Sequence, residues 1–90
     1  MAATCSANPT TVGINQTTVV SFTGLPTKTA LLETITNPAG EPTDSHLGKI
    51  AVGHLEQWQA RSTAGTWKVD LYTDNAKHTH LCGCSYEVTA

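Results

Sequence analysis

The sequence predicts an all-β domain in which about seven short antiparallel strands form two packed sheets. Gly, Pro, Asn and Asp interrupt the chain at short intervals, and no window keeps the i, i+3, i+4, i+7 apolar spacing of a helix over three turns. Thr is common, and with Val, Ile and the aromatic residues it suits a pleated, half-buried surface. At 90 residues, we expect a single domain over residues 1–90.

The first two predicted strands are separated by a proline. A short edge strand covers Ala2 to Ala7 and stops at Asn8-Pro9, because proline cannot donate to a ladder and pushes the preceding residue toward extended geometry. The second strand lies in TTVVSFTG, residues 17–24, and ends at a Gly-Leu-Pro turn. Its alternation places three residues on one face: Thr18, Val20 and Phe22.

The segment KTALLETIT, residues 28–36, is the third predicted strand. Adjacent side chains on a strand point to opposite faces, so Leu31 and Leu32 cannot both face one core. The NPAGEP turn follows and opens the least patterned stretch of the chain, residues 37–47, which we expect to be a loop. Loops of this kind often carry binding residues, although an ordinary loop has the same pattern. A short edge strand is expected over Lys49 to Val52.

The fifth and sixth predicted strands lie in the second half of the chain. A strand from about Leu55 to Arg61 would place Trp58 and Ala60 inward, with a helical turn over residues 54–59 as the alternative. TWKVDLYT, residues 66–73, has the clearest alternation, which predicts a central strand. Its inward residues are Trp67, Val69 and Leu71, and its outward residues are Lys68, Asp70 and Tyr72.

The last predicted strand follows the connection TDNAKH, in which Asp74-Asn75 suits a turn. It occupies LCGCSYEV, residues 81–88. One face of this strand collects Cys82, Cys84, Tyr86 and Val88, whereas the other is polar toward its end. The first face is therefore the expected core face.

Composition argues against several classes of function. Charged residues make up 13% of the chain and the formal net charge is −2. The chain therefore lacks the excess of positive charge that attracts nucleic acid or an anionic membrane. The opening MAATCSANPTTVG has no basic region followed by an apolar run, and no segment approaches the ~20 apolar residues of a membrane span. We therefore expect synthesis in a cytosol, with neither nucleic acid nor membrane as a partner.

Several short motifs together resemble the bacterial and phage immunoglobulin-like modules of surface adhesins and virions. NPTTVG at residues 8–13 resembles the opening after the first strand, AGTWKV at residues 64–69 the penultimate strand, and Tyr86-Glu87-Val88 the end of the last strand. The resemblance covers most of the chain and implies an immunoglobulin-like β-sandwich. These motifs carry no active site, and the cysteines do not match the sheet-to-sheet disulfide of antibody domains.

The resemblance implies a non-enzymatic virion protein that is made in the host cytoplasm and decorates a phage capsid or tail. Its partner would be the major capsid or tail protein, it would form a homo-oligomer, and a host-surface glycan is a further possible contact. No cofactor is expected, because no set of acid, base and nucleophile is apparent in the sequence. The expected contact surface is the N-terminal segment together with Pro38, Pro42, His46 and Tyr72.

Two other functions stay open. The chain could be an extracellular adhesin or carbohydrate-binding module from a longer exported protein, in which Trp58 and Trp67 would stack on sugars if they were exposed. It could also be a small metal-binding protein that uses HTHLCGC, whose candidate ligands are His78, His80, Cys82 and Cys84. On a straight strand the outermost two would lie about 20 Å apart, too far to share one zinc ion.

The three cysteines allow a further interpretation. First and last strands are commonly neighbours in such sandwiches, so Cys5 could form a disulfide with Cys82 or with Cys84. Cytosolic synthesis argues against early oxidation. The alternative is that Cys82 and Cys84 are small inward residues and that His78 and His80 are exposed.

Overall fold

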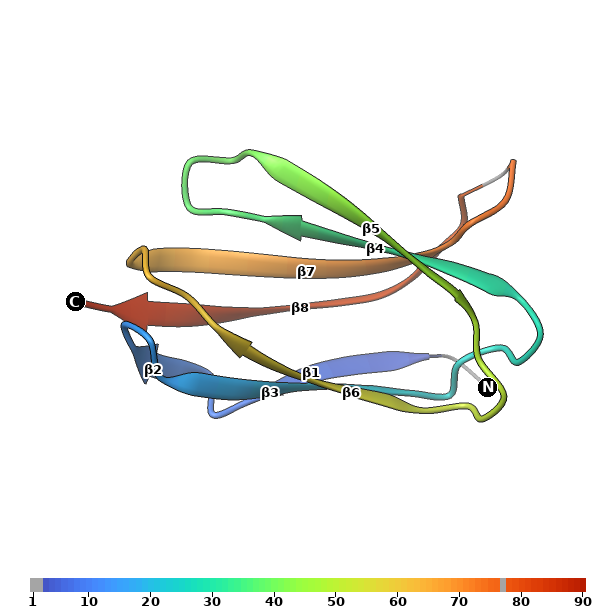
Figure 1. Cartoon of the computed structure of the whole chain (residues 1–90), viewed down its shortest axis with the longest axis horizontal. Coiled ribbons are helices and arrows are strands. Elements are labelled where there is room, and N and C mark those ends of the chain that lie inside the picture. Colours follow the sequence, from blue (N-terminus) through green and yellow to red (C-terminus); the bar gives the residue numbers. More distant parts are fainter. Residues whose placement is uncertain (1–2, 77) are drawn as a thin grey trace.

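The computed structural model describes residues 3–76 and 78–90, which form two packed sheets and no helix (Figure 1). The predicted all-β sandwich is confirmed. Ala2 in the first predicted strand and Lys77 in the last predicted turn lie outside the described residues. The strands are β1 (Thr4–Asn8), β2 (Thr11–Gly13), β3 (Thr17–Thr23), β4 (Ala30–Thr36), β5 (Pro42–Lys49), β6 (Leu55–Ala60), β7 (Gly65–Thr73) and β8 (His80–Thr89).

The smaller sheet has the strand order β1-β3-β6, and the larger has the order β2-β8-β7-β4-β5. In Figure 1 the two sheets lie as separate layers along the length of the molecule. β5 and β6 are edge strands of the larger and the smaller sheet, respectively. An edge strand keeps unpaired backbone donors and acceptors along its outer side.

The core lies between the two layers, where the predicted inward faces meet. Phe22 and Val20 of β3 are fully buried, as are Val69 and Leu71 of β7. Leu31 of β4 is also fully buried in this core, as the alternation requires. Leu32 is buried on the opposite face of its sheet, where its neighbours in the register are His46 and Tyr72.

The prediction of about seven antiparallel strands missed β2. This strand pairs in parallel with β8, and Val12 at its centre is 7% exposed. Three residues are too few to show an alternation, so the sequence pattern could not reveal it. The other strand pairs in both sheets are antiparallel.

The predicted loop over residues 37–47 and edge strand over Lys49 to Val52 are wrong. The chain turns tightly after β4, because Asn37 Oδ1 accepts hydrogen bonds from the backbone N–H groups of Ala39 and Glu41. β5 then runs antiparallel to β4 and is almost wholly exposed. A strand that buries neither face has no apolar alternation, so its sequence has the same pattern as a loop.

The predicted inward face of β6 is also wrong. Gln59 is 7% exposed and faces the interior, whereas Trp58 is 70% exposed and Ala60 is exposed as well. The two tryptophans therefore differ, since Trp67 packs against the core and is half-buried. Glutamine inward and tryptophan outward reverse the usual hydrophobic preference.

Candidate functional site

The outer face of the larger sheet gathers polar and aromatic side chains from four strands, with its histidines and carboxylates on β5, β7 and β8. We use the name outer face for six residues: Thr34, Asp44, His46, Asp70, Tyr72 and His80. The register places His46, Leu32, Tyr72 and His80 in one row across β5, β4, β7 and β8. Asp44, Thr34 and Asp70 form the adjacent row.

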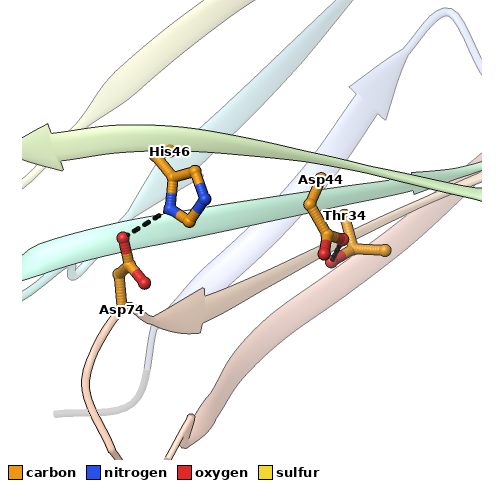
Figure 2. Close-up of polar contacts among 4 residues, drawn as sticks. All are labelled: Thr34, Asp44, His46 and Asp74. Atoms are coloured by element: carbon orange, nitrogen blue, oxygen red, sulfur yellow. Dashed lines mark hydrogen bonds and ion pairs between the residues drawn. The ribbon is translucent and has the colours of Figure 1, made fainter.

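His46 pairs with an aspartate from the loop after β7. Its Nδ1 lies 2.7 Å from Asp74 Oδ2, and beside it Thr34 Oγ donates to Asp44 Oδ1 at 2.8 Å (Figure 2). The hydrogen bond to Asp74 is the largest cause of a raised pKa of His46, and the charge on Asp74 adds to it. The imidazole is solvent-exposed, so this pair can change its protonation without unfolding.

A second His–Asp pair lies at the other end of the same row. His80 Nε2 is 3.0 Å from Asp70 Oδ1, and the ring of Tyr72 meets the His80 ring edge-on with centroids 5.1 Å apart. The Asp70 side chain crosses Gly83, because a Cβ at Gly83 would lie only 2.5 Å from Asp70 Oδ1. Any larger residue at position 83 would displace this carboxylate.

Three of the four predicted contact residues meet on one surface. Tyr72 and His46 belong to the outer face, and Pro42 lies on the same side of β5 because it is four residues from His46. Pro42 and His46 lie on a strand and not on the expected loop. Pro38 lies apart in the turn after β4, against Gly65 of β7.

The HTHLCGC segment does not bring its four candidate ligands together. Cys82 forms a disulfide with Cys5 of β1, with the two Cα atoms 5.6 Å apart. Cys84 is a half-buried thiol, and burial is the main cause of its raised pKa. His80 lies on the outer face instead, and the backbone N–H of His78 donates to Asn75 Oδ1 in the preceding turn.

Consistent with this divergence, no group of three or more His, Cys, Asp or Glu side chains suited to hold a metal ion occurs within residues 3–76 and 78–90. The same residues contain no helix of the length and hydropathy needed to cross a membrane.

A ladder of polar side chains fills one part of the sandwich interior. We use the name polar ladder for five residues: Glu33, Gln57, Gln59, Arg61 and Tyr86. Gln57 Nε2 donates to Glu33 Oε1 at 3.1 Å, and Gln59 Nε2 donates to Gln57 Oε1 at 2.8 Å. Arg61 Nη2 and the Tyr86 hydroxyl both donate to Gln59 Oε1, at 3.1 and 2.7 Å.

Glu33 lies at the end of the polar ladder with one oxygen unpaired. The residue is 3% exposed, and its Oε2 has no hydrogen-bond partner in the described part of the chain. Burial raises the pKa of Glu33, and the hydrogen bond from Gln57 and the charge of Arg61 oppose this only in part. An unsatisfied buried carboxylate oxygen is costly, so this position is unlike the rest of the interior.

A groove of about 450 Å³ opens beside the polar ladder at the edge of the smaller sheet. Its lining consists of Ile35, Gln57, Trp58, Gln59, Ala60 and Arg61. Arg61 also stacks on the half-buried ring of Trp67, with its Cζ 4.6 Å from the ring centroid. Sequence reasoning missed this groove, although the spacing of Gln57, Gln59 and Arg61 on a strand was a readable signal for three polar groups on one face.

Comparison with known proteins supports the fold and no narrower relationship. No protein-family model and no curated protein matches the sequence. The CARDB domain of the PF1109 protein from Pyrococcus furiosus, solved in complex with di-metal ions, is 11% identical, with a TM-score of 0.54 over 98% of this chain and 91% of that chain.

Superoxide reductase (neelaredoxin) from Ignicoccus hospitalis is 13% identical, with a TM-score of 0.58 over 99% of this chain and 80% of that chain. A variant of the same reductase is 16% identical, with a TM-score of 0.56 over 98% of this chain and 78% of that chain. Together with the strand order, these similarities define an immunoglobulin-like β-sandwich. At such low identity they describe the fold alone.

Proposed function

We propose that this chain is a non-catalytic structural protein that decorates the outside of a phage capsid or tail. The observation that carries the proposal is the outer face, where His46 of the exposed edge strand β5 and Tyr72 of β7 lie in one row across the sheet, with Pro42 on the same side of β5. An exposed sheet surface of paired polar groups suits contact with another protein better than turnover of a small molecule.

The charges on this surface are largely matched within it. His46 and His80 each contact an aspartate, and Asp44 accepts a hydrogen bond from Thr34. Internal pairing lowers the cost of covering these groups with a partner. Tyr72 adds a large, half-buried aromatic side chain near the centre, which is the type of residue that anchors protein interfaces.

The disulfide also fits a second candidate, an adhesin module within a longer exported chain. Cys5 and Cys82 are bonded, and such bonds persist mainly in oxidising surroundings outside the cytosol. A virion released from its host meets the same conditions, so the disulfide alone does not separate the two settings. A metal-binding function through His78 to Cys84 has no comparable support, because its candidate ligands diverge.

Co-sedimentation with assembled particles tests the first candidate. The purified chain is mixed with capsids or tails built from the structural proteins encoded beside its gene, and bound copies are counted by native mass spectrometry. We expect several copies per particle and at least a tenfold loss of affinity in Tyr72→Ala, with Trp58→Ala binding normally. The first candidate would be overturned in favour of the adhesin if the chain did not co-sediment with the particles. A coding sequence that continues into an exported protein of tandem domains would overturn it as well.

A further inference from the structure

We propose that the free edge of β5 pairs with the β5 edge of a second copy of this chain, which gives a twofold homodimer with one continuous sheet. Dimerisation at this edge goes beyond the proposed function, because it does not require attachment to a virion. Three features of β5 support it: the direction of its backbone groups, the order of Asp44 and His46 along it, and the contacts that hold these two side chains.

β5 is the last strand of the larger sheet, and its outer edge is uncovered (Figure 1). The strand has eight residues, and only Leu47 among them is not fully exposed. Its pairing partner within the sheet is β4. A long, exposed edge strand of this kind is a template on which another strand can add through backbone hydrogen bonds.

The turn before β5 shows which of its backbone groups face outward. Asn37 N–H donates to Glu41 C=O at 3.0 Å, and bonded pairs then alternate with non-bonded pairs along the antiparallel β4–β5 ladder. Up to the bulge at Leu47, the odd-numbered residues of β5 therefore bond to β4. The N–H and C=O groups of Asp44 and His46 point away from β4 and remain for a partner strand.

The ladder on the other side of β4 gives the same result. Asp74 N–H donates to Ala30 C=O at 2.7 Å, so the even-numbered residues of β4 bond toward β7 and the odd-numbered residues bond toward β5. Pro42 has no N–H and occupies an outward position, where proline takes no bond from the ladder with β4.

One antiparallel register between two copies uses these outward groups fully. With the twofold axis at Ser45, Asp44 of each copy lies opposite His46 of the other, and each such pair can exchange two backbone hydrogen bonds. An axis at Asp44 or at His46 would place identical side chains opposite each other. The first of these registers would also need an N–H from Pro42, and the second would need Gly48, whose φ of 75° is not extended.

The side chains favour the same register, because it places a carboxylate opposite an imidazole on the outer face. Asp44 Oδ1 accepts a hydrogen bond from Thr34, and His46 Nδ1 is paired with Asp74 (Figure 2). Asp44 Oδ2 and His46 Nε2 have no hydrogen-bond partner in the described part of the chain. Each held side chain thus keeps one atom for the other copy, and less conformational entropy is lost on pairing.

The shape of the strand limits the association to two copies. Ser45 at the axis is small, which suits the close approach of a non-bonded pair. The bulge at Leu47 and the positive φ of Gly48 end the pairing beyond His46. Because both copies use the same edge, the contact closes on itself and leaves no β5 edge for a third copy.

Sedimentation velocity of the full chain at about 1 to 500 µM tests the dimer, since a single strand edge gives a small and therefore weak interface. We expect a reversible rise from monomer to dimer across this range. Hydrogen exchange should locate the contact. The amides of Asp44 and His46 should exchange at least tenfold more slowly at the highest concentration, whereas the amide of Ser45, which bonds to β4, should not change.

Charge variants test the register. Asp44→Lys places two cations opposite each other and should raise the dissociation constant of the dimer at least tenfold. Glu56→Lys makes the same change of charge on the exposed edge strand β6 and should leave dimerisation unchanged. The double variant Asp44→Lys with His46→Asp restores opposite charges across the axis and should recover the parent dissociation constant to within about threefold.

A chain that stays monomeric up to about 500 µM would overturn the dimer. Equal weakening by Asp44→Lys and Glu56→Lys would mean that net charge, and not the β5 edge, controls association. Failure of the double variant to recover, or slowed exchange at amides outside β5 alone, would overturn the proposed pairing as well. Far-ultraviolet circular dichroism of each variant shows that a loss of dimer is not a loss of fold.

Discussion

The interior of the sandwich has two regions of opposite character, although both arise from the same alternation of side chains. In the apolar region, Phe22 and Leu71 are fully buried, and the disulfide between Cys5 and Cys82 joins the two sheets. In the polar region, Glu33 and Gln59 occupy equivalent inward positions and are linked by hydrogen bonds through Gln57. Inward orientation alone therefore does not decide whether a position stabilises the fold.

The difference follows from the two kinds of free energy involved. Apolar burial stabilises by about 25 cal/mol per Å² and needs no particular partner. Polar burial is close to neutral when every group is paired, and it costs free energy when one is not. We therefore expect the apolar region to supply the stability, and the polar region, where Glu33 Oε2 is unpaired, to contribute little or to lower it.

Truncation of Phe22 should give the largest effect. Phe22→Ala removes a fully buried ring and leaves a cavity between the sheets, which is expected to lower the free energy of unfolding by about 3 to 5 kcal/mol. Urea denaturation followed by tryptophan fluorescence measures it. Trp58→Ala serves as the control, because the residue is 70% exposed and loss of its side chain should change stability by less than about 0.5 kcal/mol.

Loss of the disulfide should give the second-largest decrease in the free energy of unfolding. The bond closes a loop with a sequence separation of 77, so Cys5→Ser with Cys82→Ser should lower the free energy of unfolding by about 2 to 4 kcal/mol. Equilibrium denaturation of the double variant measures the loss. Cys84→Ser keeps the disulfide and should cost clearly less. Equal losses in the two variants would mean that packing of small residues, and not the cross-link, is what holds β1 to β8.

The apolar region was the predictable part of the molecule. The pattern of TTVVSFTG places Thr18, Val20 and Phe22 on one buried face, and the pattern of β7 places Val69 and Leu71 there. When one face of a sheet is buried, a strand with strong alternation of apolar and polar residues is stable in only one orientation, with its apolar residues on the buried face. The same reasoning places Cys82 and Tyr86 of β8 inward, where they are buried.

The polar region and the edges could not be predicted in this way. Hydrophobicity favours Trp58 inward, but β6 is an edge strand whose inward Gln59 is held by Arg61 and Tyr86. That network depends on pairing between distant strands, which no local pattern encodes. β5 has no readable pattern because both of its faces are exposed, and neither Glu33 nor the groove belongs to any recognisable motif.

Neutralisation of Glu33 should change the free energy of unfolding by less than truncation of Phe22 or loss of the disulfide does. It should also raise this free energy, whereas those two changes lower it. Because burial raises the pKa of Glu33 in the folded state above its ordinary value of 4.5, folding favours the protonated form. This stabilising contribution is full below pH 4.5 and is lost as the pH rises through the folded-state pKa. Glu33→Gln should therefore raise the free energy of unfolding by about 1 kcal/mol at pH 7.

The pH dependence distinguishes this explanation from a simple change of packing. The gain in Glu33→Gln should shrink as the pH falls through the folded-state pKa and should be smallest below pH 4.5, where the parent residue is protonated as well. Chemical denaturation of both proteins at about pH 4 and pH 7 measures the difference. A gain of the same size at both values would show that the ionised carboxylate is not what destabilises the polar region.

The His46–Asp74 pair contrasts with Glu33, because its carboxylate is paired and in contact with solvent, whereas that of Glu33 is buried. The pair raises the pKa of His46 above 6.5, chiefly through the hydrogen bond to Asp74, with Asp44 as the smallest cause. Its contribution to stability is full below pH 6.5 and is lost as the pH rises through the folded-state pKa, but the group is fully exposed and solvent screens it.

Asp74→Asn should therefore lower the pKa of His46 with little change in stability, and Asp44→Asn should lower that pKa less. The titration of the His46 ring protons measures both shifts by nuclear magnetic resonance. An equal or larger shift in Asp44→Asn would mean that the general negative charge of the outer face, and not the bond drawn in Figure 2, sets the protonation of His46.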